Sequence, residues 1–275
     1  MASKVIIDNS GSFPAVATKL KSKVSVGFEW EIPAMMSECT CCEENDYDCD
    51  YCNGDYGIPE MSQASKDFAF DYGFRVHGEC GGAEFASPVF RSIASARVMA
   101  RRIKEMKALD PELGYNEDHS CGIHVHTGYT GWDTYQQALR AHDKVQYMLN
   151  RESSAEFVLA FSGRENGSSD YIHQGESTGW DTSGLDKPDC DHKEFMYARE
   201  MTRLNRFGVN NTIEYRLWDT ADGRLLPAIE FAHACTNFIV ARKADTIPYL
   251  KDFRKWLDTR SGYKILKTDP AWSLL

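Results

Sequence analysis

Two histidines separated by one residue, His124 and His126, are the clearest candidates for chemistry in this sequence. Successive side chains of a β-strand point to opposite faces, so the two imidazoles would share one face. The β-branched residues that alternate with them, and that favour a strand, are Ile123, Val125 and Thr127. Imidazoles on one face can bind a metal ion. A half-buried strand with solvated histidines fits the pattern equally well, so this stretch alone leaves both interpretations open.

A second strand, predicted over residues 24–32, carries two glutamates, Glu29 and Glu31, on one face. Its other face holds Val24, Val26, Phe28, Trp30 and Ile32. Neighbouring carboxylates on one strand face repel one another unless a cation or water separates them. A cation site and an exposed sheet face are equally compatible with this strand.

From Phe68 the chain regains β character, and two further segments carry acidic residues. Glu79 and Glu84 flank the pair Gly81-Gly82, where a turn or bulge would let both carboxylates converge. In the run from Thr212 to Trp218, Glu214 and Arg216 share a face. A glutamate beside an arginine on a strand is commonly only a surface ion pair.

Together these segments predict an α+β fold. We expect a curved, largely antiparallel sheet, a half barrel whose concave face carries the acids, histidines and arginine. Amphipathic helices predicted over residues 92–109, 134–150, 226–242 and 248–258 would cover its convex face. We expect one catalytic domain over residues 1–275, because the chain is 42% hydrophobic and long enough for one large core.

Composition narrows the choice of partners. The formal net charge of -10 argues against nucleic acid as a partner. The sequence contains no apolar run of about eighteen residues, the length that would indicate a membrane span, and its N-terminal residues do not resemble a signal peptide. We therefore expect a cytoplasmic protein.

Residues 34–66 form a predicted insert rich in cysteine and acidic residues. Its thiols could hold a structural Zn²⁺ ion, although a labile disulfide loop or unliganded thiols are alternatives. These cysteines are Cys39, Cys41, Cys42, Cys49 and Cys52. Residues 163–192, rich in Gly, Ser and Asp, are predicted to form a long loop.

Most of the predicted metal ligands are carboxylate oxygens. Five glutamates with one or two histidines suit Mg²⁺ or Mn²⁺ better than zinc. Such metals chiefly serve phosphate chemistry.

The order of these segments resembles the glutamine synthetase superfamily of carboxylate-amine ligases, and most closely the amidoligase family of bacteria and phages. Gly27 to Glu31 resembles the family's Gly-x-Glu-x-Glu strand, and Ser120 to His126 its Ser-x-Gly-x-His-x-His strand. Arg203-Leu204-Asn205 and Thr212 to Arg216 resemble its closing segments. His77-Gly78 departs from the Asp-Gly that relatives often have, and the cysteine insert is not a feature of the family as a whole.

The resemblance implies a role for each site residue. One divalent ion would be held by Glu31, Glu79 and Glu84, and a second by Glu29, His124 and Glu214. Arg216 would contact the transferred phosphoryl group, while His126 and Arg203 or Arg206 would contact phosphate or acyl phosphate.

The implied activity is ATP-dependent amide or isopeptide bond formation through an acyl phosphate. The substrates would be a small-molecule or peptide carboxylate and an amine. Neither a Gly-x-x-x-x-Gly-Lys-Ser/Thr loop nor a Gly-x-Gly-x-x-Gly fingerprint occurs, so the nucleotide would be held mainly through metal. The alternatives are a metal-dependent hydrolase, an oxygenase that uses the His-x-His strand, and a non-catalytic binding protein with the same fold.

Overall fold

A six-stranded antiparallel sheet forms the centre of the computed structural model, with strand order β2-β3-β1-β4-β6-β5. The structure describes residues 23–33, 61–79, 82–110, 113, 122–132, 134–152, 155–162, 202–205, 212–219, 223–242 and 248–274. The strands are β1 (Val24–Pro33), β2 (Arg75–Glu79), β3 (Gly82–Ala86), β4 (Gly122–Tyr129), β5 (Thr202–Asn205) and β6 (Thr212–Asp219).

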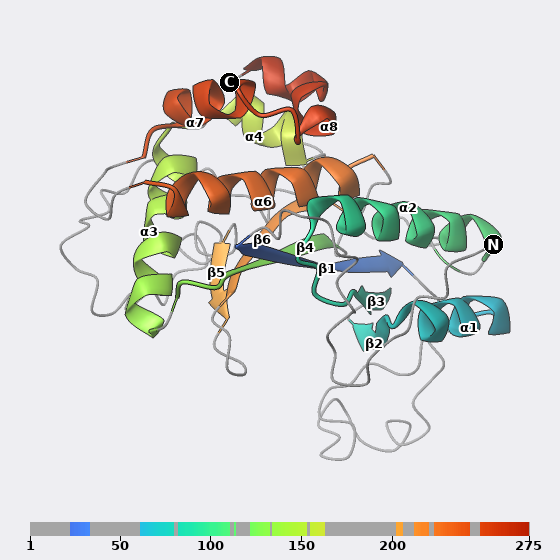
Figure 1. Cartoon of the computed structure of the whole chain (residues 1–275). Helices are drawn as coiled ribbons and strands as arrows, with labels where there is room; N and C mark the ends of the chain where they lie inside the picture. Colours follow the sequence, from blue (N-terminus) through green and yellow to red (C-terminus); the bar gives the residue numbers. More distant parts are fainter. Residues whose placement is uncertain are drawn as a thin grey trace, which may run out of the picture.

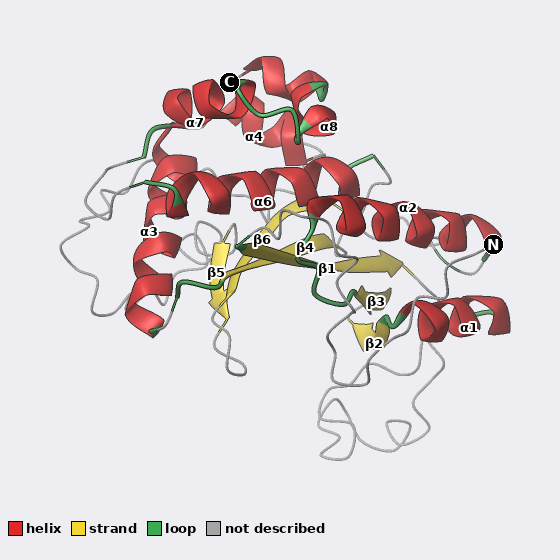
Figure 2. Cartoon of the chain, in the orientation of Figure 1, coloured by secondary structure: helices red, strands yellow, loops and turns green. Residues whose placement is uncertain are grey.

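The two faces of the sheet differ as the alternation of β1 predicts. The apolar residues Val24, Val26, Phe28, Trp30 and Ile32 of β1 are buried, at 0–1% exposure, and all but Val24 belong to the main core. Helix α6 (Leu225–Val240) contacts β1, β4 and β6, while α2 (Ile93–Leu109) contacts β1 and α6. Both helices lie along one side of the sheet, and the figures show them together above β1 and β4 (Figures 1 and 2). The helices therefore cover the apolar face and leave the acidic residues on the other.

Further helices surround α6. Helices α7 (Leu250–Asp258) and α8 (Lys264–Lys267) contact α6, and α3 (Tyr135–Glu152) contacts α6, β5 and β6. Helix α4 (Ala155–Ser162) contacts β6, and a short 3-10 helix, Pro270–Leu274, packs on α4. Aromatic rings join the layers: Phe231 of α6 lies 5.9 Å from Trp218 of β6 and 5.8 Å from Phe253 of α7, between ring centroids. Such buried aromatic contacts hold α6 between the sheet and the outer helices.

The helix α3 begins as the sequence predicts. The Thr134 hydroxyl accepts a hydrogen bond from the Gln137 N–H at 3.4 Å, and the Gln137 side chain accepts one from the Thr134 N–H at 3.2 Å. This reciprocal pair satisfies amide groups that the first turn of a helix leaves without partners.

The expectation that β structure resumes at Phe68 is wrong. Residues Gln63–Tyr72 form helix α1, which Ser62 caps and which ends at Gly73 with φ 70°. The rings of Phe68 and Tyr72, one helical turn apart, lie 4.4 Å from each other, and Phe68 also stacks near Phe74. The ring contact one turn apart and the packing of α1 on α2 and β2 favour the helix over the local β propensity of the aromatic residues.

The expected fold class is confirmed, while most of the predicted insert over residues 34–66 and all of the predicted loop over residues 163–192 lie outside the described residues. The architecture is α+β with an antiparallel sheet, and β2 and β3 form a hairpin in which Glu79 pairs with Gly82. Among the described residues, no helix is both long enough and apolar enough to span a lipid bilayer.

Candidate metal centre

The register of the strands brings the acidic residues and histidines onto one sheet face. Glu29 of β1 lies opposite His124 of β4, and Glu31 lies opposite Glu84 of β3. Directly opposed residues of an antiparallel pair share a face, so these side chains project together from the side that α2 and α6 leave uncovered.

A β-bulge between β4 and β6 adjusts the position of His124. Ile123 pairs with Trp218 and Val125 pairs with Tyr215, so one more residue separates the two partners on β6 than on β4. The extra residue bends a strand and changes its local twist. As a result, Arg216 reaches the His124 ring, and its Nε donates a hydrogen bond to His124 Nε2 at 3.3 Å.

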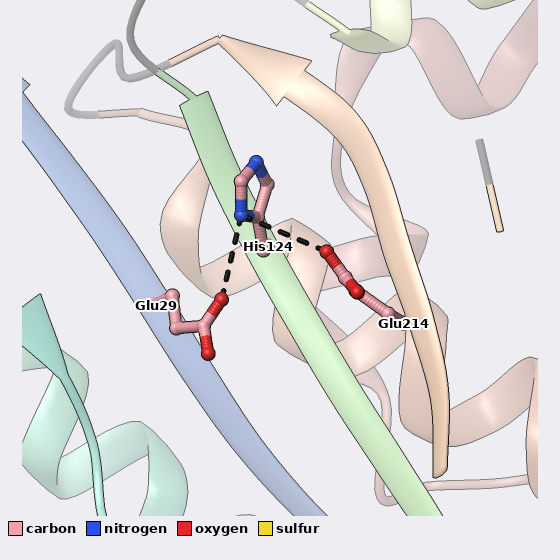
Figure 3. A group of neighbouring side chains, drawn as sticks. All are labelled: Glu29, His124 and Glu214. Atoms are coloured by element: carbon pink, nitrogen blue, oxygen red, sulfur yellow. Dashed lines mark ion pairs between the residues drawn. The ribbon is translucent and has the colours of Figure 1, made fainter. Parts of the chain in front are cut away.

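The first candidate metal group contains Glu29, His124 and Glu214, whose ligand atoms all lie within 4.8 Å of one another. His124 Nδ1 is 3.4 Å from Glu29 Oε2 and 3.9 Å from Glu214 Oε1. Figure 3 shows both carboxylates directed from neighbouring strands toward the same ring nitrogen. These are the three residues expected to hold one of the two ions.

The second candidate group contains Glu31, Glu84 and His124, again with ligand atoms within 4.8 Å of one another. His124 Nε2 lies 3.6 Å from Glu31 Oε1. The other Glu31 oxygen accepts a 2.6 Å hydrogen bond from the Gly122 N–H, which fixes the orientation of the carboxylate. The His124 imidazole therefore lies between two carboxylate groups, with one ring nitrogen toward each.

The electrostatics of the centre favour an ionised Glu29. Burial alone would raise the pKa of Glu29, but contacts with His124 and His126 outweigh it and hold that pKa well below its ordinary value. His126 Nε2 lies 3.1 Å from Glu29 Oε2, in an ion-pair contact that lacks hydrogen-bond geometry. Burial lowers the pKa of His126, but Glu29 and more distant carboxylates outweigh this effect and raise it.

The donor set fits a divalent cation. Each group offers two carboxylates and one imidazole, and oxygen-rich sets of this kind suit Mg²⁺ or Mn²⁺. Glu214 and the His124 side chain are buried, with 8% exposure each. Buried carboxylates in such proximity repel one another, and a bound cation would offset this repulsion.

Several expected site residues are placed only through their backbones or lie outside the described residues. Glu79 ends β2, and Arg203 of β5 lies opposite Glu214. Arg206 and the insert cysteines lie outside the described part of the chain: Cys39, Cys41, Cys42, Cys49 and Cys52.

Two features of the centre did not follow from the sequence. The sharing of His124 by both groups depends on the register of β1, β3 and β4, which no local pattern specifies. The Gly122 N–H acts through its backbone, so residue type gave no signal for it. The glycine two residues before His124 was visible only as part of the strand motif.

No protein-family model and no curated protein sequence matches the chain. Among solved structures, Plasmodium falciparum glutamine synthetase is similar with a TM-score of 0.46 and 13% identity, over 80% of this chain and 52% of that one. A glutamine synthase homolog gives a TM-score of 0.38 and 11% identity, over 91% of this chain and 65% of that one. The complex of the prokaryotic ubiquitin-like protein Pup with its ligase PafA gives a TM-score of 0.36 and 11% identity, over 88% of this chain and 51% of that one. The chain thus spans between about half and two thirds of the length of these proteins.

Proposed function

We propose that this protein is an ATP-dependent carboxylate-amine ligase that forms an amide or isopeptide bond through an acyl phosphate. The observation that carries the proposal is the arrangement around His124. Two carboxylate groups, Glu29 with Glu214 and Glu31 with Glu84, flank one imidazole on the sheet face opposite helices α2 and α6. The guanidinium of Arg216 lies at the same ring.

Metal ligation would use residues from five strands. Glu29, His124 and Glu214 would hold one ion, while Glu31 and Glu84, with Glu79 as a further ligand, would hold the other. Bound Mg²⁺ or Mn²⁺ would neutralise charge on the polyphosphate of ATP and polarise the γ-phosphoryl group. A hydrolytic enzyme with two ions could use a similar set, and the test below distinguishes it.

The reaction proceeds in two balanced steps. An oxygen of the substrate carboxylate attacks the γ-phosphorus, the bond from that phosphorus to the bridging oxygen breaks, and ADP leaves. The amine then attacks the carbonyl carbon of the acyl phosphate, inorganic phosphate leaves, and the amine nitrogen loses a proton to solvent. The first step makes the carboxylate electrophilic, because phosphate is a much better leaving group than oxide.

Arg216 and His126 act on the phosphoryl oxygens in this scheme. A planar guanidinium presents donors in a fixed fork that matches phosphate oxygens. His126 is held beside Glu29, whose negative charge raises the pKa of the imidazole and favours its cationic form. Arg203 and Arg206 are further candidates for contacts to phosphate or acyl phosphate.

Hydroxylamine trapping tests the proposal. Purified protein is incubated with ATP, Mg²⁺ and hydroxylamine, together with pools of amino acids, peptides or other carboxylates, and both ADP and hydroxamate are measured. We expect one pool to give equal amounts of both products, only when nucleotide and metal are present. The Arg102→Ala variant, altered on the exposed face of α2, should behave as the wild type. Metal-dependent hydrolysis of a substrate without nucleotide would contradict the proposal and favour a hydrolase.

A further inference from the structure

Three buried hydroxyl groups join helix α6 to the two strands that carry His126 and Glu214. Thr236 of α6 lies with its Oγ1 2.7 Å from Thr127 Oγ1 and 2.8 Å from Tyr215 Oη. All three residues have at most 1% of their surface exposed. This cluster, Thr127, Tyr215 and Thr236, is called the hydroxyl cluster below.

The hydroxyl cluster lies directly behind the candidate metal centre. Thr127 follows His126 on β4, and Tyr215 lies between Glu214 and Arg216 on β6. Because side chains alternate along a strand, the hydroxyls point to the helix while their neighbours point to the acidic face. Each hydrogen bond of the cluster therefore acts on a backbone position next to a candidate ligand.

The cluster also lies just beyond the β-bulge. The register of β4 and β6 shifts between Ile123 and Val125, and regular pairing resumes with Val125 opposite Tyr215. Bulges interrupt the ladder hydrogen bonds that otherwise hold two strands in register. A slip of one residue would turn His126 or Glu214 to the opposite face.

If apolar side chains of the same shape replaced the hydroxyl cluster, they would fill this part of the core but would not fix the register of β4 against β6. Hydrophobic contacts have no preferred direction, whereas a buried hydroxyl that loses its partner costs free energy. A sliding movement of β4 against β6 would break at least one bond of the cluster, since Thr236 contacts both strands at once.

We propose that Thr236 is a positioning residue, which fixes β4 and β6 against α6 and thereby sets the distance of the His124 and His126 imidazoles from Glu214 and Arg216. This inference adds to the proposed function and depends on it only where metal or nucleotide binding is the readout. Thr236 touches neither substrate nor metal in this account. Its effect passes through the strand backbones.

Three variants of α6 test the inference. Thr236→Val keeps the shape and removes the hydroxyl, while Thr236→Ser keeps the hydroxyl and removes a methyl group. Ile239→Val is the control for a small packing change, because Ile239 is buried in the same helix and the substitution removes one carbon, as Thr236→Ser does, and no hydroxyl. Thermal unfolding and amide hydrogen exchange are measured for each, followed by Mn²⁺ binding detected by electron paramagnetic resonance.

We expect amide exchange in residues 122–129 and 212–219 to accelerate roughly tenfold in Thr236→Val, as expected for loss of a buried hydrogen bond, and less in the other two variants. Mn²⁺ affinity should fall by a similar factor in Thr236→Val and recover in Thr236→Ser. Equal effects of Thr236→Val and Ile239→Val would overturn the inference. If the wild type binds no Mn²⁺, the proposed function fails, and the exchange measurement still decides whether Thr236 fixes the strands.

Discussion

Arg216 lies against the imidazole that both candidate metal groups share. Its Nε is 3.3 Å from His124 Nε2 and 3.4 Å from Glu214 Oε1, and its side chain is 29% exposed. Arg216 thus contacts both the His124 ring and the Glu214 carboxylate, while part of its side chain remains exposed to solvent. An arginine in this position can reach a phosphoryl group bound over the acidic face, and it neutralises part of the charge on Glu214.

Arg216→Lys should slow ADP formation by roughly tenfold to a thousandfold, the range for loss of one transition-state contact. Lysine retains the charge but not the fork of donors, so nucleotide affinity should change much less. Single-turnover kinetics and nucleotide binding separate the two effects. Normal turnover with lost nucleotide binding would reassign Arg216 to ground-state binding.

Loss of the cation from a buried ion pair outside the site should lower the free energy of unfolding markedly. Arg97 of α2 lies with its Nη2 2.7 Å from Glu230 Oε1, and Glu230, fully buried, also accepts a 2.8 Å hydrogen bond from the Leu266 N–H. Arg97→Ala would leave this carboxylate without its cation and should cost about 3 kcal/mol in the free energy of unfolding. Urea denaturation measures the loss.

The destabilisation caused by Arg97→Ala should depend on pH. Burial raises the pKa of Glu230, and removal of Arg97 should raise it further, because a protonated carboxyl tolerates burial better. Arg97→Ala should therefore be less destabilising at pH 5 than at pH 8. Arg102→Ala removes an exposed ion pair of the same helix and should change the free energy of unfolding little. Equal losses for both variants would contradict a structural role for the buried pair.

His233 of α6 should make the protein less stable in acid. Burial lowers the pKa of His233 to about 4, a backbone hydrogen bond at Val24 opposes the shift, and Arg97 adds to it. Between about pH 6.5 and 4 the unfolded chain binds the proton more readily, so the free energy of unfolding decreases as the pH falls, by up to about 1.4 kcal/mol per pH unit from this group. His233→Gln should flatten this part of the stability profile, measured by urea denaturation. An unchanged slope would show that His233 does not titrate in this range.

The cysteine-rich insert is predicted to hold structural zinc through four of its five thiols. Metal analysis of protein purified without added zinc should find about one equivalent, the stoichiometry of a tetrahedral thiolate site. Cys235 is buried and its pKa is raised by burial, so it should react slowly with thiol reagents. Less than stoichiometric zinc, together with free titration of all five insert thiols, would contradict the prediction.

The sequence allowed the faces of individual strands and their assembly into an antiparallel sheet to be predicted, but not the register in which the strands pair. The alternation around Glu29 and Glu31 predicted β1, because apolar and polar residues alternate without interruption. Helix α1 was missed, since Phe68, Tyr72 and Phe74 favour strands locally and the helix depends on their packing. The β-bulge that sets Arg216 against His124 leaves no mark in composition or period, because it arises from pairing between distant strands.

Titration with Mn²⁺ tests the central claim most directly, because the two groups share one ligand and differ in the others. Calorimetry on the wild type should reveal two sites. Glu84→Gln should weaken one site and Glu214→Gln the other, each by about tenfold or more, while His124→Ala should weaken the site formed with Glu29 and Glu214 more strongly than the other. Two sites that persist unchanged in Glu214→Gln and His124→Ala, or a wild type that binds no divalent ion with or without nucleotide, would contradict the account.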